Sequence, residues 1–213
     1  MALAMQASKV AAMKTLLALF SGFALILTAN HLRAEAVVGQ PAPAFTLNDL
    51  EGKPVSLASY AGKIVVLEWT NVDCPFVHKH YDSGNIPKLQ QTYTAKGVVW
   101  LSINSSAPGE QGNLPAAQIE ARRTAWHAAS TDYLTDAEGK VGRLYGAKTT
   151  PHFFIVDASG VLRYAGAIDS IPSPDPADIP HAENYVAEAL DALLSGQPVK
   201  TASTRSYGCS VKY

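Results

Sequence analysis

The sequence predicts an α/β fold in one domain, and three patterns indicate it. A buried strand, a helix and a second buried strand follow one another between residues 64 and 103, a β-hairpin lies between 152 and 167, and an amphipathic helix ends near Leu194. The 213 residues are 47% hydrophobic, which is enough to bury a sizeable core.

The first residues of the chain have the pattern of a secretory signal. Two lysines precede an apolar run over residues 16–27, which is shorter than the roughly 20 residues of a membrane-spanning helix. Ala34-Glu35-Ala36 follows as a cleavage site of the A-x-A type. We therefore expect residues 1–36 to be a signal peptide, and 37–213 to be a periplasmic or secreted domain without a stable membrane span. An uncleaved anchor, and a true start at Met13, are the alternatives.

The next elements follow from hydrophobic spacing and turn residues. The first half of the chain is expected to form an N-terminal hairpin over 45–47 and 55–57, a buried strand over 64–70, a helix from 75 that breaks between 84 and 87, and a buried strand over 98–103. The second half is expected to form a loop over 104–114, a helix over 115–129, a short edge strand over 133–135, a helix capped by Asp136, the hairpin of 152–156 and 161–167, a proline-rich loop over 168–180 and a helix over 182–194.

Charge and motifs limit the function classes. The net charge is −1 and only 16% of residues are charged, so the sequence has no electrostatic footprint for nucleic acid or an anionic membrane. It also has no glycine-rich phosphate loop, zinc pattern or Ser-His-Asp order, and we expect no cofactor. Small molecules or protein thiols are the expected partners.

Cys74 is the candidate reactive residue. It lies where the strand over 64–70 gives way to a helix, and Pro75 is typical of the first helical position, so Cys74 is expected at the N-cap. The unpaired N–H groups and the positive end of the helix dipole favour an anion there, and the thiolate is the nucleophilic form of cysteine. The sequence therefore predicts a reactive thiol at Cys74.

Cys209 is the other cysteine of the chain, so Cys74–Cys209 is the intramolecular disulfide that the sequence allows. An oxidising compartment favours that bond. It could form during redox chemistry, aided by a mobile tail around Gly208, or it could be a permanent staple worth roughly 4–5 kcal/mol for a loop of this length. The residues alone leave both roles open.

A family resemblance emerges once these elements are assembled. A β-α-β unit with a cysteine at the helix start, Thr149-Thr150-Pro151 before a hairpin and a closing helix resemble the thioredoxin fold, a central mixed sheet flanked by helices. The segments 41–47, 49–52 and 60–63 resemble the opening of the alkyl hydroperoxide reductase/thiol-specific antioxidant (redoxin) branch, and 71–81, 105–112 and 208–212 resemble a peroxiredoxin-like subgroup. The resemblance extends over 37–213.

The chain departs from both motifs of that group. Thioredoxins carry Cys-x-x-Cys, but Val77 stands at the second cysteine position here, so no local disulfide can form. Peroxiredoxins carry Pro-x-x-x-Thr-x-x-Cys, and in that register Thr70, Cys74 and Val77 replace the proline, threonine and cysteine.

The resemblance implies a thiol-dependent oxidoreductase. Cys74 would attack a protein disulfide or a peroxide, Cys209 would resolve the product, and an electron-donor thiol protein would reduce the pair. The resemblance also implies a cis peptide bond at Pro151, which would present the Thr150 backbone beside the thiol to bind an extended substrate.

Two further interpretations involve the histidines and acids near Cys74. Cys74 and His78 are spaced i, i+4 and His152 follows the proline, so a copper-binding or metallochaperone-like site is an alternative. Glu68 could assist proton transfer, although a solvated position at the sheet edge is the simpler expectation for it, as a solvated helix face is for His80.

Overall fold

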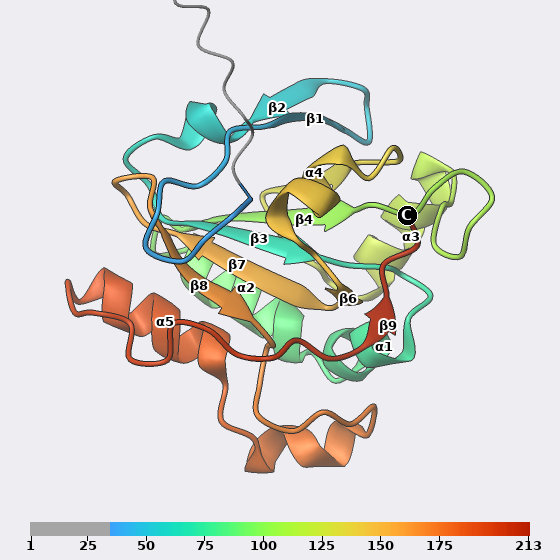
Figure 1. Cartoon of the computed structure of the whole chain (residues 1–213). Coiled ribbons are helices and arrows are strands. Elements are labelled where there is room, and N and C mark those ends of the chain that lie inside the picture. Colours follow the sequence, from blue (N-terminus) through green and yellow to red (C-terminus); the bar gives the residue numbers. More distant parts are fainter. Residues whose placement is uncertain (1–34) are drawn as a thin grey trace, which may run out of the picture. The chain divides into compact units, whose positions relative to one another are not determined.

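A seven-stranded mixed sheet forms the centre of the fold in a computed structural model that describes residues 35–213 (Figure 1). The strand order is β2-β1-β5-β4-β3-β7-β8. The strands are β1 (Thr46–Asp49), β2 (Pro54–Ser56), β3 (Val65–Trp69), β4 (Val99–Asn104), β5 (Asp132–Thr135), β7 (His152–Val156) and β8 (Leu162–Gly166). Of the predicted signal peptide over residues 1–36, positions 1–34 lie outside the described residues.

Parallel pairing of β3 with β4 forms the middle of the sheet, and β7 runs antiparallel on the other side of β3. The α/β class, the N-terminal hairpin of β1 and β2, and the hairpin of β7 and β8 are confirmed. The expectation of an edge position for residues 133–135 is wrong. The strand β5 pairs with β4 and also with β1, because the N-terminal hairpin docks outside it.

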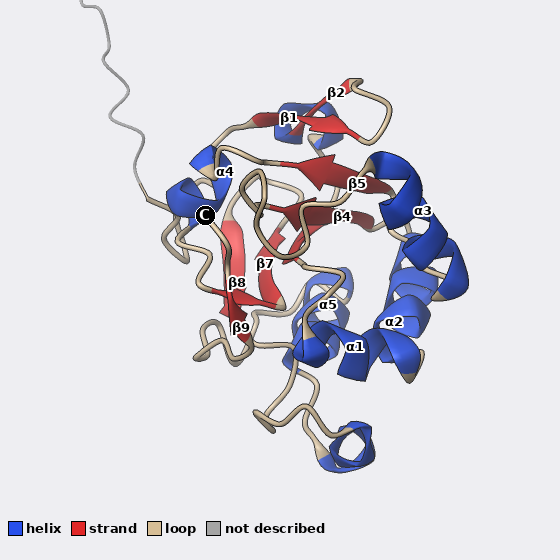
Figure 2. Cartoon of the chain, turned by 90° about the vertical axis from the view of Figure 1, so that its right-hand side faces the viewer, coloured by secondary structure: helices blue, strands red, loops and turns tan. Residues whose placement is uncertain are grey.

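The two faces of the sheet are covered by different helices. α1 (Pro75–Asp82), α2 (Asn85–Thr94) and α5 (Tyr185–Leu194) pack on the face that carries Val66, whereas α4 (Lys140–Tyr145) packs on the face that carries Leu67. Figure 2 shows α1, α2 and α3 (Ala116–Ala125) on one side of the strands and α4 on the other. Side chains alternate in direction along a strand, so the nearly continuous apolar runs supply both cores.

Local sequence signals explain the helix ends. The predicted break separates α1 from α2 at Gly84, whose φ of 72° suits glycine, and Pro87 falls in the first turn of α2, where a missing N–H is harmless. Asp136 does serve the start of α4, but from outside it. Gly139 is the N-cap, and the Asp136 carboxylate accepts from the N–H groups of Val141 at 3.2 Å and Gly142 at 2.8 Å.

A separate two-stranded sheet joins the segment before β7 to the C-terminal tail. The strand β6 (Thr149–Thr150) pairs antiparallel with β9 (Cys209–Ser210). The short 3-10 helices η1 (Leu57–Tyr60) and η2 (Pro176–His181) complete the described elements. Within residues 35–213, no helix has the length and apolar character needed to cross a membrane.

Candidate active site

Cys74 is the N-cap of α1, as the sequence predicts, and Pro75 is the first helical residue. Its carbonyl accepts the first helical hydrogen bonds, while its side chain makes no capping bond. The Cys74 Sγ instead donates to the carbonyl oxygen of Thr150 at 3.1 Å, a bond that only the protonated thiol can make. The side chain is 0% exposed, so no external molecule reaches the sulfur in this arrangement.

The loop before Cys74 is held by the loop that follows β4. Asn71 Oδ1 accepts from the Asp73 N–H at 2.9 Å, and Asn71 Nδ2 donates to the Gln111 carbonyl at 3.0 Å. Gly112 lies so close that an added Cβ would be 2.2 Å from Asn71 Oδ1. The two loops meet at the carboxyl ends of β3 and β4, the sheet edge at which ligands bind in open α/β folds.

Thr150 and Pro151 lie next to the thiol and are joined by a cis peptide bond, as the resemblance implies. The Thr150 backbone is already paired, however, because Cys209 is its partner in the β6–β9 ladder. Gly208 makes this approach sterically feasible, since an added Cβ would lie 2.0 Å from the Thr150 oxygen. The C-terminal tail therefore occupies the backbone edge at which the resemblance implies that a substrate would pair.

Cys209 is partly exposed and, like Cys74, is a free thiol in the structure. Burial raises the pKa of Cys209 to about 11, and hydrogen bonding and charge from Cys74 add to the rise, while Lys212 opposes it. This interaction shows that the fold brings Cys74 and Cys209 close in space although they are far apart in the sequence. Cys209 is therefore protonated at neutral pH.

The tail around Cys209 is docked rather than free. Val211 N–H donates to the Lys148 carbonyl at 3.1 Å, the Lys212 carbonyl accepts from Ala107 N–H at 2.7 Å, and the Tyr213 hydroxyl donates to the Ala147 carbonyl at 2.7 Å. The small residues before Cys209 predict a mobile tail, but the structure holds the tail by these backbone and side-chain hydrogen bonds. Movement of the tail must therefore break a defined set of bonds.

Glu68 is buried, which contradicts the expectation of a solvated charge. Its side chain is 0% exposed and accepts from Trp100 Nε1 at 2.6 Å, the Tyr81 hydroxyl at 2.8 Å and Gln90 Nε2 at 3.3 Å. Burial raises the pKa of Glu68, and these hydrogen bonds oppose the rise. Glu68 thus joins the sheet to α1 and α2 beneath the site.

The alternative metal site of Cys74, His78 and His152 is wrong. His78 Nδ1 lies 2.9 Å from Asp82 Oδ2, and its ring packs against Trp126. The buried His152 accepts at Nδ1 from a backbone N–H and packs on an aromatic ring. Residues 35–213 contain no group of three His, Cys, Asp or Glu side chains that could hold a metal ion.

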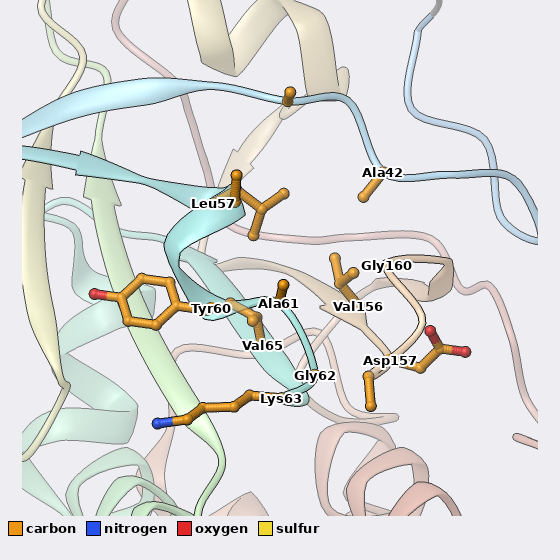
Figure 3. A pocket seen from close by; sticks show the side chains of 13 residues that line it. Ala42, Leu57, Tyr60, Ala61, Gly62, Lys63, Val65, Val156, Asp157 and Gly160 are labelled. Carbon is orange, nitrogen blue, oxygen red and sulfur yellow. The ribbon is translucent and has the colours of Figure 1, made fainter.

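A cavity of about 210 Å³ lies away from the cysteines (Figure 3). It is lined mainly by apolar side chains such as Leu57, Val65 and Val156, with Lys63 and Asp157 at its wall. Val65 begins β3, whereas Cys74 follows the end of that strand, so this cavity is at the opposite end of the sheet.

Taken together, the mixed sheet, the helix-capping cysteine and the cis-proline define a redoxin with a thioredoxin-like fold. Residues 38–165 match the model of the AhpC/TSA family, and the chain belongs to that family. Val77, at the position of the second thioredoxin cysteine, is buried in the first turn of α1, which therefore carries a single thiol.

The chain is also similar to individual proteins of other organisms. The chain is 26% identical over 151 residues to the thiol-disulfide oxidoreductase ResA of Geobacillus thermodenitrificans (strain NG80-2), covering 70% of this chain and 80% of the relative. The hypothetical protein SMc02350 from Sinorhizobium meliloti 1021 is 27% identical with a TM-score of 0.70, covering 84% and 96% of the two chains. A Chlorobium tepidum chain assigned as thiol:disulfide interchange protein DsbE shares the fold, at 24% identity and a TM-score of 0.51, covering 62% and 85%.

Proposed function

We propose that this protein is an exported thiol–disulfide oxidoreductase that uses Cys74 as nucleophile and Cys209 as resolving thiol. The observation that carries the proposal is the double role of Thr150. Its carbonyl accepts from Cys74 Sγ at 3.1 Å, and Cys209 is its strand partner. Similarity to a thiol-disulfide oxidoreductase supports the same reaction class.

The reaction has two exchange steps. The Cys74 thiolate attacks one sulfur of a protein disulfide, forms a mixed disulfide and releases the other substrate sulfur as a thiolate. Cys209 then loses its proton and attacks Cys74 Sγ, which leaves a Cys74–Cys209 disulfide, and the expelled second substrate sulfur takes up that proton. The substrate has gained two electrons, and a donor dithiol protein returns the pair to the reduced state.

Access to Cys74 requires the tail to move. Because Cys74 is fully buried and β9 occupies the Thr150 edge, β9 must leave before an extended substrate can pair with Thr150. Docking of β9 after the first exchange would return Cys209 to Cys74 for the second. A peroxide is the alternative oxidant, for which Cys74 would form a sulfenic acid that Cys209 converts to the disulfide with loss of water.

A permanent structural disulfide is the competing role for the same pair. A redox titration in glutathione buffers, read by alkylation and peptide mass spectrometry, separates the two. In the wild-type protein we expect a potential above about −300 mV for the Cys74–Cys209 pair. The Cys74→Ser variant is expected to lose insulin-disulfide reduction, and the Cys209→Ser variant is expected to accumulate mixed disulfides with the substrate. A potential below about −300 mV without turnover would establish the staple instead.

Export is part of the proposal and rests on the leader of residues 1–36. N-terminal sequencing of protein recovered from the periplasmic fraction is expected to begin at Val37. Recovery of the chain in the cytoplasm with its leader intact would contradict export and leave the exchange chemistry to its own test.

A further inference from the structure

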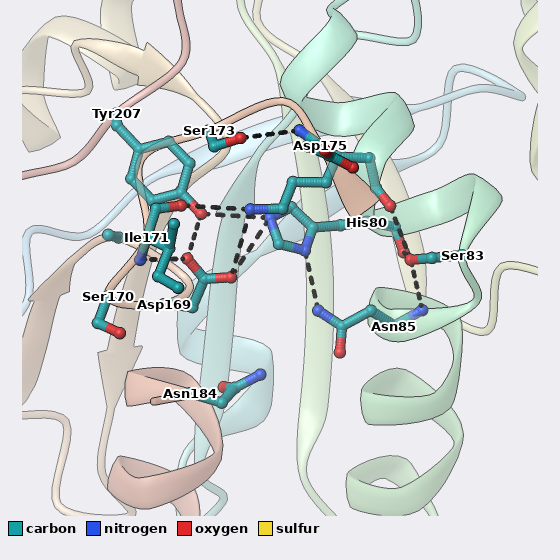
Figure 4. A network of polar contacts seen from close by, with 12 residues as sticks. His80, Ser83, Asn85, Asp169, Ser170, Ile171, Ser173, Asp175, Asn184 and Tyr207 are labelled. Atoms are coloured by element: carbon teal, nitrogen blue, oxygen red, sulfur yellow. Dashed lines mark hydrogen bonds and ion pairs between the residues drawn. The ribbon is translucent and has the colours of Figure 1, made fainter. Parts of the chain in front are cut away.

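A buried polar cluster joins α1 to the C-terminal tail (Figure 4). Lys79 and His80 lie in α1, Asp169 follows β8, and Tyr207 belongs to the tail. The Tyr207 hydroxyl donates to Asp169 Oδ1 in a short hydrogen bond and lies 3.3 Å from His80 Nε2. Asp169 Oδ2 lies 3.8 Å from both Lys79 Nζ and His80 Nε2.

The cluster is withdrawn from water. The side chains of Lys79 and His80 are 0% exposed and that of Asp169 is 2% exposed. Burial, followed by the charge of Lys79, lowers the pKa of His80 to about 3, so this histidine is neutral at pH 7. Burial and Asp169 raise the pKa of Tyr207 above its ordinary value, so its hydroxyl stays a donor. Breaking a buried, paired charge is costly, and the cluster is therefore a rigid attachment point.

Cys209 is two residues further along the chain than Tyr207, so anchoring Tyr207 in the cluster restricts the position of Cys209. Gly208 lies between them, and an added Cβ at this position would be 2.0 Å from the Thr150 carbonyl oxygen, so the chain runs close against β6 here. Phe76, in the first turn of α1, packs edge-on against the Tyr207 ring. The tail is thus held at the end of α1 by Tyr207 and beside its start by Cys209.

We propose that the Tyr207–Asp169 hydrogen bond is a positioning latch that keeps Cys209 beside Cys74 and keeps Cys74 covered. This inference rests on the proposed function, because it assigns the residues that present the resolving thiol. A docked tail raises the effective concentration of Cys209 at Cys74 and so favours their disulfide. Glutathione disulfide provides a defined oxidant, which becomes two glutathione thiols as the Cys74–Cys209 bond forms.

The test compares two tyrosine-to-phenylalanine variants. Tyr207→Phe removes the latch bond. Tyr60→Phe removes a bond of the same kind, in which the Tyr60 hydroxyl donates to the Asp132 carboxylate at 2.7 Å, and Tyr60 packs against the core cluster that does not contain the cysteines. The equilibrium constant for oxidation by glutathione disulfide and the alkylation rate of Cys74 are measured in each. We expect Tyr207→Phe to lower the constant about tenfold and raise the rate about tenfold, and Tyr60→Phe to change neither.

The outcomes separate the latch from the function. If both quantities in Tyr207→Phe stay within twofold of wild type while Cys74→Ser abolishes turnover, the latch is refuted and the function stands. If wild type forms no Cys74–Cys209 disulfide, the proposed function fails, and the Cys74 alkylation rate alone decides the latch. Asp169→Asn is a second variant that is expected to raise the same alkylation rate, with circular dichroism reporting whether it folds.

Discussion

Replacing Gly208 with alanine is expected to expose Cys74. Gly208 has a φ of +133°, a region that side-chain-bearing residues rarely adopt, and the new Cβ would lie 2.0 Å from the Thr150 oxygen. Such backbone strain costs about 1–3 kcal/mol, and it acts on the docked tail but not on the undocked one. Since every 1.4 kcal/mol is about tenfold, the undocked population should rise about 5- to 150-fold.

The alkylation rate of Cys74 measures that population. Reduced protein is treated with iodoacetamide, and Cys74 and Cys209 are followed separately by peptide mass spectrometry. The control is Gly196→Ala, which introduces the same chemical change at a φ of +68° with no atom within 4 Å of the added Cβ. If the alkylation rate of Cys74 in Gly208→Ala stays within twofold of wild type at an unchanged thermal midpoint, the C-terminal tail does not cover Cys74 and the reasoning is refuted.

Three further predictions concern groups around the site. Burial lowers the pKa of His152 to about 4, so its contribution to stability is complete above pH 6.5 and is lost as the pH falls towards 4. In denaturant titrations, the free energy of unfolding of His152→Asn should fall by about 3 kcal/mol less than that of wild type between pH 6.5 and pH 4, while the buried His80 still lowers stability in acid in both proteins. Burial raises the pKa of Glu68 above its ordinary 4.5, so its contribution to stability is complete below pH 4.5 and is lost as the pH rises through the raised pKa. Glu68→Gln should therefore reduce the loss of stability as the pH rises above 4.5. Asn71→Ala removes two hydrogen bonds beside Cys74 and should destabilise the protein by about 1–3 kcal/mol, measured by urea unfolding.

Each of these has a defined contrary result. An unchanged acid limb in His152→Asn would mean that the imidazole is solvated in the folded state. A Glu68→Gln variant that keeps the wild-type slope would mean that the pKa of this carboxyl is alike in the folded and unfolded chain. An Asn71→Ala variant as stable as wild type would mean that the loop before Cys74 is held by other contacts.

The order of elements was predictable because it depends on local patterns. Hydrophobic runs fix the position of β3 and β4, Pro75 fixes the start of α1, and Gly84 fixes its separation from α2. The interior position of β5 was not predictable from its own residues, since it depends on where the distant N-terminal hairpin pairs. Short strands carry too little pattern to reveal their neighbours.

The candidate site was predictable as a set of residues but not as an arrangement. Cys74, Thr150, Pro151 and Cys209 do meet, because the cysteine caps a helix and the threonine precedes a cis-proline beside it. The buried Lys79–Asp169 pair was missed, since charged residues are normally solvated and nothing local marks an exception. One local feature does indicate such an exception, because three consecutive polar residues of α1, Lys79, His80 and Tyr81, cannot all lie on the solvent-facing side of the helix.

The separation of the two cysteines in sequence would make the proposed disulfide a reporter of the whole fold. In a Cys-x-x-Cys motif the two thiols are neighbours in sequence, whereas here Cys209 is brought to the site of Cys74 by the pairing of β6 with β9. Loss of a few C-terminal residues to a protease would leave a protein with a single thiol at Cys74. The proposed disulfide would therefore report that the C-terminal tail is present and docked, because a molecule cut before Cys209 could not form it.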